Sequence, residues 1–102
     1  LLGIGPDGHV ASLFPNDHAA LTERIRRVVG VPRANVAPFV PRVSLTLPGL
    51  ASTHEMLFLV AGPDKQAILQ QILSGADLPA SHAHAADGET LWLIDRAARP
   101  LN

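Results

Sequence analysis

The fold is indicated by the stretch Glu55-Met56-Leu57-Phe58-Leu59-Val60-Ala61-Gly62-Pro63-Asp64, which runs from an apolar segment into a turn. An almost wholly apolar run of this length is typical of a strand that is covered on both faces, as in a parallel sheet. Its last three residues predict a tight turn into a helix. The apolar stripe of that helix extends to a stop at Gly75 and consists of Ala67, Ile68, Leu69, Ile72 and Leu73.

A second apolar strand follows the predicted helix. Residues Thr90-Leu91-Trp92-Leu93-Ile94 form another run of the buried type, and the run ends at Asp95. Two parallel strands joined by a right-handed helical crossover are the simplest arrangement of these pieces. The residues themselves therefore predict an α/β fold with a parallel pair of strands.

The rest of the chain predicts short elements separated by turns. An opening strand over 1–4 leads into a loop at 5–8 and a helical turn over Val10 to Leu13, which Pro15 ends. Asp17 is a candidate N-cap for a helical turn over Ala19 to Glu23. We also expect strands over 25–31 and 42–47, an irregular proline-rich segment over 32–41, a short helix over 49–53, and a helical turn plus loop over 77–87.

Composition limits the function classes. The 102 residues are 47% hydrophobic and 17% charged, which predicts one folded globular domain. Eight basic against nine acidic side chains give a net charge of -1, which argues against nucleic-acid binding. The chain has no Cys, so disulfides, Cys-based zinc sites and a thiol nucleophile are excluded. The longest apolar runs are too short to span a bilayer, so we expect no membrane partner.

The loop after the opening strand carries the candidate chemistry. Gly3-Ile4-Gly5-Pro6-Asp7-Gly8 matches the G-x-G-x-x-G dinucleotide pattern, but Pro15 leaves no room for the long helix that this motif needs. A different use of the loop is favoured, in which Asp7 and His9 face one cavity. A carboxylate beside a histidine sets the tautomer and orientation of a general base. The spacing alone also allows a purely structural turn in which Asp7 caps the loop.

Four blocks of the chain resemble the 6-phosphogluconolactonases. These blocks are 1–15, Pro41-Arg42-Val43-Ser44-Leu45-Thr46-Leu47-Pro48, 58–65, and 78–80 together with 91–95. The resemblance implies a doubly wound, mostly parallel, Rossmann-like α/β sheet, shared with glucosamine-6-phosphate deaminases. It also implies hydrolysis of 6-phosphoglucono-δ-lactone to 6-phosphogluconate in the pentose phosphate pathway, in the cytoplasm, with no cofactor and no metal.

The resemblance also implies roles for individual residues. His9 would be the general base that activates water, and Asp7 would hold its imidazole. Gly5 and Gly8 would bring loop amides close to the developing oxyanion. Lys65, which stands where a helix begins, and Arg42 would contact the phosphate of the substrate. Taken alone, each of these two cations is also typical of a solvent-exposed surface position.

Two other functions stay open. One is a segment that binds a sugar phosphate without turning it over. The other is the aldose-ketose isomerising deaminase of the same superfamily, whose related loop carries an acidic residue five positions after the histidine. That position is Phe14 here, and a phenyl ring cannot serve as a second acid–base group, so lactone hydrolysis is favoured.

The chain opens with Leu1-Leu2-Gly3-Ile4, without an initiator methionine. We therefore expect residues 1–102 to be the C-terminal portion of a single domain whose N-terminal half is absent; a processed complete domain is the alternative. The enzymes it resembles are more than twice as long, and their N-terminal half carries a Gly-rich Ser/Thr loop that contributes to phosphate binding. We expect a sugar phosphate as partner, a monomer, and an isolated segment that is unstable without the missing half.

Overall fold

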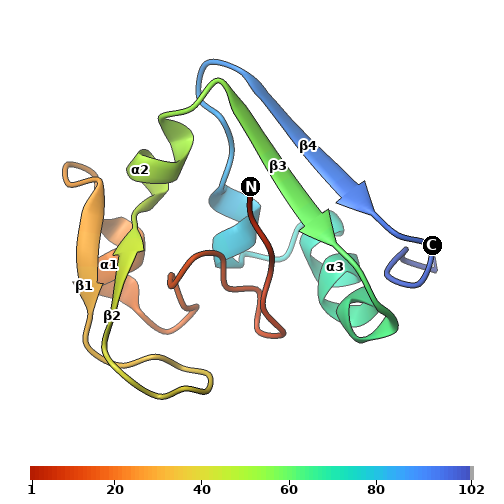
Figure 1. Cartoon of the computed structure of the whole chain (residues 1–102), viewed down its shortest axis with the longest axis horizontal. Coiled ribbons are helices and arrows are strands. Elements are labelled where there is room, and N and C mark those ends of the chain that lie inside the picture. The colour runs from red at the N-terminus through yellow and green to blue at the C-terminus, as the bar shows by residue number, and fades with distance from the viewer. Residues whose placement is uncertain (102) are drawn as a thin grey trace.

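Two small sheets organise the computed structural model, which describes residues 1–101 (Figure 1). The sheets stand apart, with the opening segment of the chain between them. The elements are, in order, α1 (His18–Thr22), β1 (Val28–Val31), β2 (Arg42–Leu45), α2 (Leu47–Ala51), β3 (Glu55–Val60), the 3-10 turn η1 (Pro63–Lys65), α3 (Gln66–Leu73), the 3-10 turn η2 (Pro79–His82) and β4 (Glu89–Ile94).

Strands β3 and β4 form the parallel pair that the sequence predicts. Their register runs from Glu55 opposite Glu89 to Val60 opposite Ile94. Helix α3 joins them and packs Ile68, Leu69 and Ile72 on one face of the pair, against Met56, Phe58 and Val60 of β3, to form the main core. Ala67 and Leu73, which were also predicted for the apolar stripe, are exposed instead. The predicted strand, turn, helix and second strand are therefore confirmed, and so is the α/β class.

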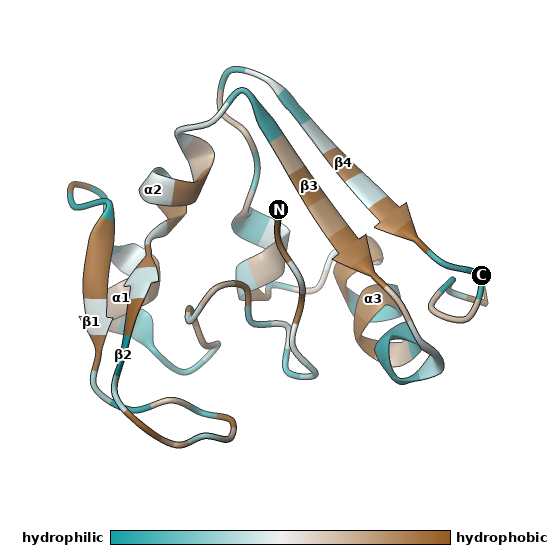
Figure 2. Ribbon diagram, in the orientation of Figure 1, coloured by the Kyte–Doolittle hydropathy of each residue, from teal (hydrophilic) through white to brown (hydrophobic). Residues whose placement is uncertain are grey.

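The opposite face of the β3–β4 pair carries leucines. Leu59, Leu91 and Leu93 are each about half exposed, at 55%, 48% and 52%. Their positions alternate with buried residues along β3 and with half-buried residues along β4, so they share the face that α3 does not cover. Figure 2 shows the apolar colour of β3 along nearly its whole length. Within the described residues, helical cover is thus present on one face of this sheet.

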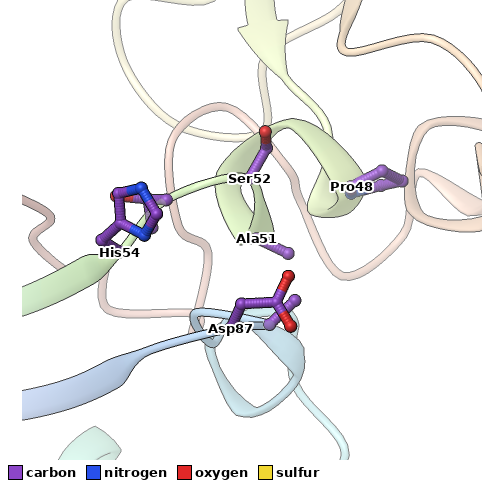
Figure 3. A pocket seen from close by; sticks show the side chains of 7 residues that line it. Pro48, Ala51, Ser52, His54 and Asp87 are labelled. Carbon is purple, nitrogen blue, oxygen red and sulfur yellow. The ribbon is translucent and has the colours of Figure 1, made fainter.

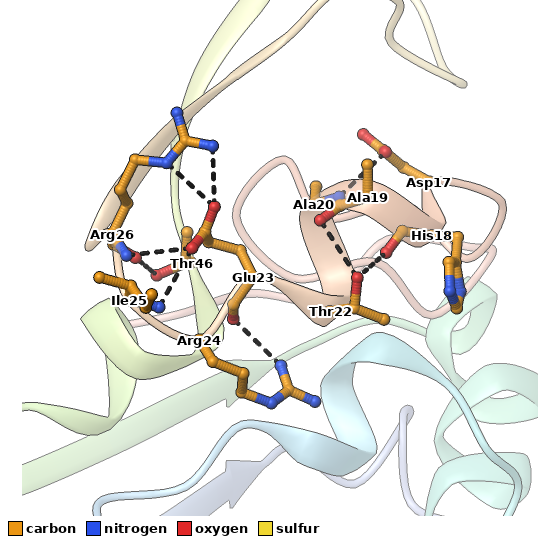
Figure 4. Close-up of polar contacts among 10 residues, drawn as sticks. All are labelled: Asp17, His18, Ala19, Ala20, Thr22, Glu23, Arg24, Ile25, Arg26 and Thr46. Carbon is orange, nitrogen blue, oxygen red and sulfur yellow. Dashed lines mark hydrogen bonds and ion pairs between the residues drawn. The ribbon is translucent and has the colours of Figure 1, made fainter.

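Strands β1 and β2 pair antiparallel and are shorter than predicted. The expected strand over 25–31 begins only at Val28, because the Glu23 carboxylate accepts hydrogen bonds from the backbone N–H groups of Ile25 and Arg26 and curls the chain there (Figure 4). The strand expected to reach residue 47 ends at Leu45. The Thr46 hydroxyl accepts from the amide of Gly49, and so caps α2 instead of extending the strand.

The opening segment lies alongside β3 without forming a full strand. Leu2 makes one parallel bridge to Phe58, with its N–H donating to the carbonyl of Leu57 at 2.7 Å. The ladder stops because the carbonyl of Ile4 accepts from Lys65 Nζ, at 2.5 Å, instead of from a strand amide. The expected strand over 1–4 is therefore reduced to one bridge, and this bridge holds the following loop near the carboxyl end of β3.

Three other expectations have mixed outcomes. The helical turn predicted over Val10 to Leu13 is wrong: these residues form a reverse turn in which Ala11 has a φ of 51°, outside the right-handed helix. The Asp17 N-cap is confirmed, since its carboxylate accepts from the amide of Ala20. Residues 32–41 contain no helix or strand, as predicted.

No helix in 1–101 is long and apolar enough to cross a membrane.

Candidate active site

The loop over residues 5–9 is closed by its own backbone hydrogen bonds. The Gly5 amide donates to the carbonyl of His9 at 2.9 Å, and the Gly8 amide donates to that of Gly5 at 3.0 Å. Gly8 adopts a φ of 85°, which favours glycine. The amide of Ala80, in η2, donates a hydrogen bond to the carbonyl of Gly8. The loop therefore has a fixed shape near the carboxyl end of β3, and open α/β sheets bind ligands at the carboxyl ends of their strands.

Asp7 and His9 form a close pair within this loop. His9 Nδ1 lies 2.5 Å from Asp7 Oδ1, and the backbone N–H of His9 donates to the same oxygen at 3.1 Å. The side chains are 15% exposed for His9 and 23% exposed for Asp7. A carboxylate can only accept, so Nδ1 is the donor and Nε2 is left as the basic nitrogen. The predicted juxtaposition of these two residues is therefore present.

The imidazole of His9 is held between Gly5 and Phe14. A Cβ added to Gly5 would stand 1.9 Å from the ring carbon Cε1 and 2.0 Å from Nδ1, so the ring fills the space that any side chain would occupy. On another side, the ring of the fully buried Phe14 has its centroid 4.8 Å from that of His9. Gly5 thus acts by making room for the base, a role that the sequence pattern alone did not reveal.

The second oxygen of Asp7 has a partner that sequence analysis missed. Asn35 Nδ2 lies 3.4 Å from Asp7 Oδ2. Partial burial acts to raise the pKa of Asp7, whereas hydrogen bonds from His9, the His9 charge and the Asn35 amide lower it, and the net pKa lies below the usual 3.8. Asp7 is therefore ionised at neutral pH. Asn35 stands in the irregular segment 32–41, where no spacing rule points to it.

Lys65 is joined to the loop through the backbone. Its Nζ donates to the carbonyl of Ile4, the residue before Gly5, at 2.5 Å. The side chain is half-buried at the end of η1, just before α3 begins. The structure therefore brings Lys65 to the same loop as Asp7 and His9, although the two positions are far apart in the sequence.

Arg42 lies behind Phe14. Its Nη2 donates to the carbonyls of Pro38 at 3.0 Å and Val36 at 3.4 Å, and its guanidinium carbon stands 5.7 Å from the centre of the Phe14 ring. Across residues 1–101, no hydrogen bond or ion pair joins Arg42 to Asp7 or His9. Arg42 thus reaches the base only through the phenyl ring.

The loop amides are mostly used inside the loop. Those of Gly5, Gly8 and His9 donate to loop acceptors, and Pro6 has no N–H. The backbone N–H of Asp7 has no partner among residues 1–101. It is therefore the amide of this loop that is left to donate to a ligand.

His9 and His54 line two different open pockets. His9 lines one of about 400 Å³ together with Ala11 and residues 1–4. A larger one of about 470 Å³ lies at the opposite, amino ends of β3 and β4, with Ser52, His54 and Asp87 on its walls (Figure 3). No hydrogen bond joins these three side chains within the described residues, so they form no catalytic set there. Nor do three His, Asp or Glu side chains of 1–101 gather where a metal ion could bind.

Comparison with known proteins gives a consistent result. Residues 1–92 match the family described as Glucosamine-6-phosphate isomerases/6-phosphogluconolactonase. The chain is 46% identical over 100 residues to the 6-phosphogluconolactonase of Streptomyces coelicolor, with 96% of this chain and 38% of that protein covered. It is 39% identical over 104 residues to the human 6-phosphogluconolactonase, with coverages of 99% and 40%.

A solved structure supports the same relationship. The crystal structure of 6-phosphogluconolactonase from Thermotoga maritima superposes with a TM-score of 0.79 at 36% identity, over 91% of this chain and 40% of that chain. The chain therefore spans about two fifths of the length of the relatives that it matches.

Proposed function

The chain belongs to the glucosamine-6-phosphate isomerase/6-phosphogluconolactonase family, and on that premise we propose that it carries the catalytic loop of a 6-phosphogluconolactonase. The reaction is hydrolysis of 6-phospho-D-glucono-1,5-lactone to 6-phospho-D-gluconate in the oxidative pentose phosphate pathway, in the cytoplasm and without a cofactor. The observation that carries the proposal is the 2.5 Å contact between His9 and Asp7, with the imidazole seated on Gly5.

The first chemical step is addition of water to the lactone carbonyl. His9 Nε2 takes a proton from the water as its oxygen bonds to C1, and the carbonyl electrons move onto the carbonyl oxygen. The resulting imidazolium is stabilised by the ionised Asp7 at Nδ1. The free backbone N–H of Asp7 is the loop group that can donate to the oxyanion.

The second step is collapse of this intermediate. The bond between C1 and the ring oxygen breaks, and the ring oxygen takes the proton from His9 Nε2 to become a hydroxyl. The carboxylic acid then loses a proton to solvent and leaves as the carboxylate. His9 ends neutral, so the cycle needs one base and no redox group. Lys65 supports binding of the phosphate, because its ammonium stands beside the loop.

The isomerising deaminase is not favoured. Its chemistry requires a second acid–base group five positions after the histidine, and that position is Phe14. Phe14 is fully buried and its ring faces His9. A buried hydrocarbon ring keeps the base in apolar contact and can transfer no proton. We therefore propose hydrolysis over isomerisation.

We propose that residues outside this chain supply the rest of the site. The relatives are about two and a half times as long, so we propose that an N-terminal portion supplies further phosphate contacts. The half-exposed leucine face of β3 and β4 fits the same idea, since both faces of a parallel sheet are normally covered. We propose a monomer in which both portions form one domain.

The proposal is tested with the 102-residue chain and a version extended upstream to the length of the relatives. Hydrolysis of freshly prepared 6-phosphogluconolactone is measured against its spontaneous decay, with His9→Ala as the variant and His54→Ala as a matched control. His54 is exposed and lies at the opposite end of β3. We expect activity in the extended protein that falls at least about 10²-fold in His9→Ala and stays unchanged in the control.

Loss of activity in both histidine variants, or in neither, contradicts the role of His9. Binding of 6-phosphogluconate without any turnover, in an extended protein that is folded, supports the noncatalytic alternative instead.

A further inference from the structure

The segment 32–41 is packed into the same unit as the candidate base. Ala34 is buried with Phe14 and Val31 in a small core of its own, and Val36 packs against that core. Phe14 in turn contacts the His9 ring. A segment without helix or strand therefore has a defined position beside the site, because Ala34 and Val36 pack into a small core that includes Phe14, whose ring lies against the base.

Arg42 fixes this segment from its other end. The guanidinium donates to the carbonyls of Val36 and Pro38 and stands over the face of Phe14. These contacts provide hydrogen-bond donors for backbone carbonyls that are not paired within a helix or strand. Asn35, which lies between the anchored Ala34 and Val36, is consequently held by packing on both sides of its backbone.

Asn35 meets the free side of the Asp7 carboxylate. Both His9 contacts go to Oδ1, one from the ring and one from the backbone, and both leave Oδ2 unoccupied. Asn35 Nδ2 lies 3.4 Å from this Oδ2. Each carboxylate oxygen thus has its own partner, and a rotation of the carboxylate would break the contacts of both.

We infer that Asn35 is a positioning residue, which orients the Asp7 carboxylate and through it the His9 imidazole. This inference rests on the hydrolysis proposed above, for which His9 Nε2 must point at a water. An amide suits the position because it donates a hydrogen bond without bringing a charge. A carboxylate of the same shape would instead set two negative groups against each other.

The chemical difference between these two groups gives the test. The variants are Asn35→Ala, which removes the donor, and Asn35→Asp, which keeps the shape and replaces the donor with a negative acceptor. The matched control is Asn16→Ala. Asn16 is an exposed asparagine that lines the same surface pocket as Asn35 but has no hydrogen bond to Asp7. All are made in the extended protein. Kinetics give kcat and KM, and carboxyl ¹³C NMR follows the titration of Asp7.

We expect kcat to fall on the order of tenfold in Asn35→Ala with little change in KM, as for the loss of an outer partner that orients a reacting group. Asn35→Asp should be slower still, and the pKa of Asp7 should rise in both variants, more in Asn35→Asp. The control should match the unaltered protein. A residue that merely filled space would give the opposite order, because Asn35→Asp preserves volume and polarity.

Several results would overturn the inference. They are an unchanged Asp7 titration in both variants, an unchanged kcat in both, or an Asn35→Asp enzyme as fast as the unaltered one. Melting curves of each variant identify a general loss of folding, in which case the carboxyl signal of Asp7 in the molecules that remain folded is titrated. If the unaltered protein hydrolyses no lactone, the proposed function fails, whereas the Asp7 titration still decides whether Asn35 acts on the carboxylate.

Discussion

A methyl group at position 5 should disable the base while leaving the fold intact. In Gly5→Ala the new Cβ would stand 1.9 Å from Cε1 of His9 and 2.0 Å from Nδ1, whereas ordinary contact begins near 3.4 Å. The nearest ring atom must therefore withdraw by about 1.5 Å, or the loop backbone must shift by the same amount. Either movement breaks the 2.5 Å contact between His9 and Asp7.

The size of the effect follows from this displacement. Misplacing a reacting group by about 1 Å can cost about 10²-fold in rate, and a general base contributes roughly 10²–10⁴-fold in all. We therefore expect kcat to fall by at least about 10²-fold in Gly5→Ala. Overpacking should reduce the free energy of unfolding by only about 1–3 kcal/mol, so that the variant still folds in the extended protein.

The assay compares Gly5→Ala with Gly3→Ala. Gly3 lies two residues earlier in the same segment, and a Cβ there would have no atom within 4 Å. Lactone hydrolysis gives kcat, and ¹⁵N NMR of the imidazole reports whether Nδ1 still carries the proton. Equal kcat values for the two alanine variants, or an unchanged imidazole spectrum in Gly5→Ala, would refute the idea that Gly5 seats the base.

Two further predictions concern the charges around the loop. Lys65→Met, which keeps the length of the side chain, should raise KM for the phosphorylated lactone about tenfold and leave the hydrolysis of an unphosphorylated lactone unchanged. An equal loss of activity with both substrates would mean that Lys65 acts only through its bond to the carbonyl of Ile4. Because the pKa of Asp7 is lowered in the folded state, its contribution to stability is present above pH 3.8 and is lost as the pH falls through the folded value. The difference in unfolding free energy between the unaltered protein and Asp7→Asn should therefore shrink below pH 3.8 in denaturant titrations, and a difference that grows in acid would contradict this sign.

Long apolar runs made part of the fold predictable. The run over 55–61 is continuously apolar and the α3 segment has a helical period, so the strand and the helix of the parallel unit both follow from local signals. The bounds of the shorter elements are harder to predict from the sequence, since local hydrogen bonds decide where these elements end. The Glu23 carboxylate shifts the start of β1 to a later residue, and the Thr46 hydroxyl ends β2. Neither effect appears as a periodic pattern in the sequence.

The candidate site was predictable to the extent that it is local. Asp7 and His9 are two residues apart, so the loop that holds one also holds the other. The link from Lys65 to Ile4 and the contact from Asn35 to Asp7 depend on how distant segments pack, and no spacing in the sequence encodes them. The role of Gly5 was likewise hidden, because the space that a glycine leaves can be recognised only when its neighbour is in place.

The anchoring of the 5–9 loop has a consequence for the order of events at the ribosome. The residues of the loop are synthesised before the residues that support it: Ile4 is made before Lys65, and the carbonyl of Gly8 before the amide of Ala80. Roughly seventy residues separate the last pair, which corresponds to about 4–15 s of translation. A nascent chain arrested before η2 would contain Asp7 and His9 but would lack the bond from Ala80 to the carbonyl of Gly8, so the loop gains its full support only after residue 80 has been made.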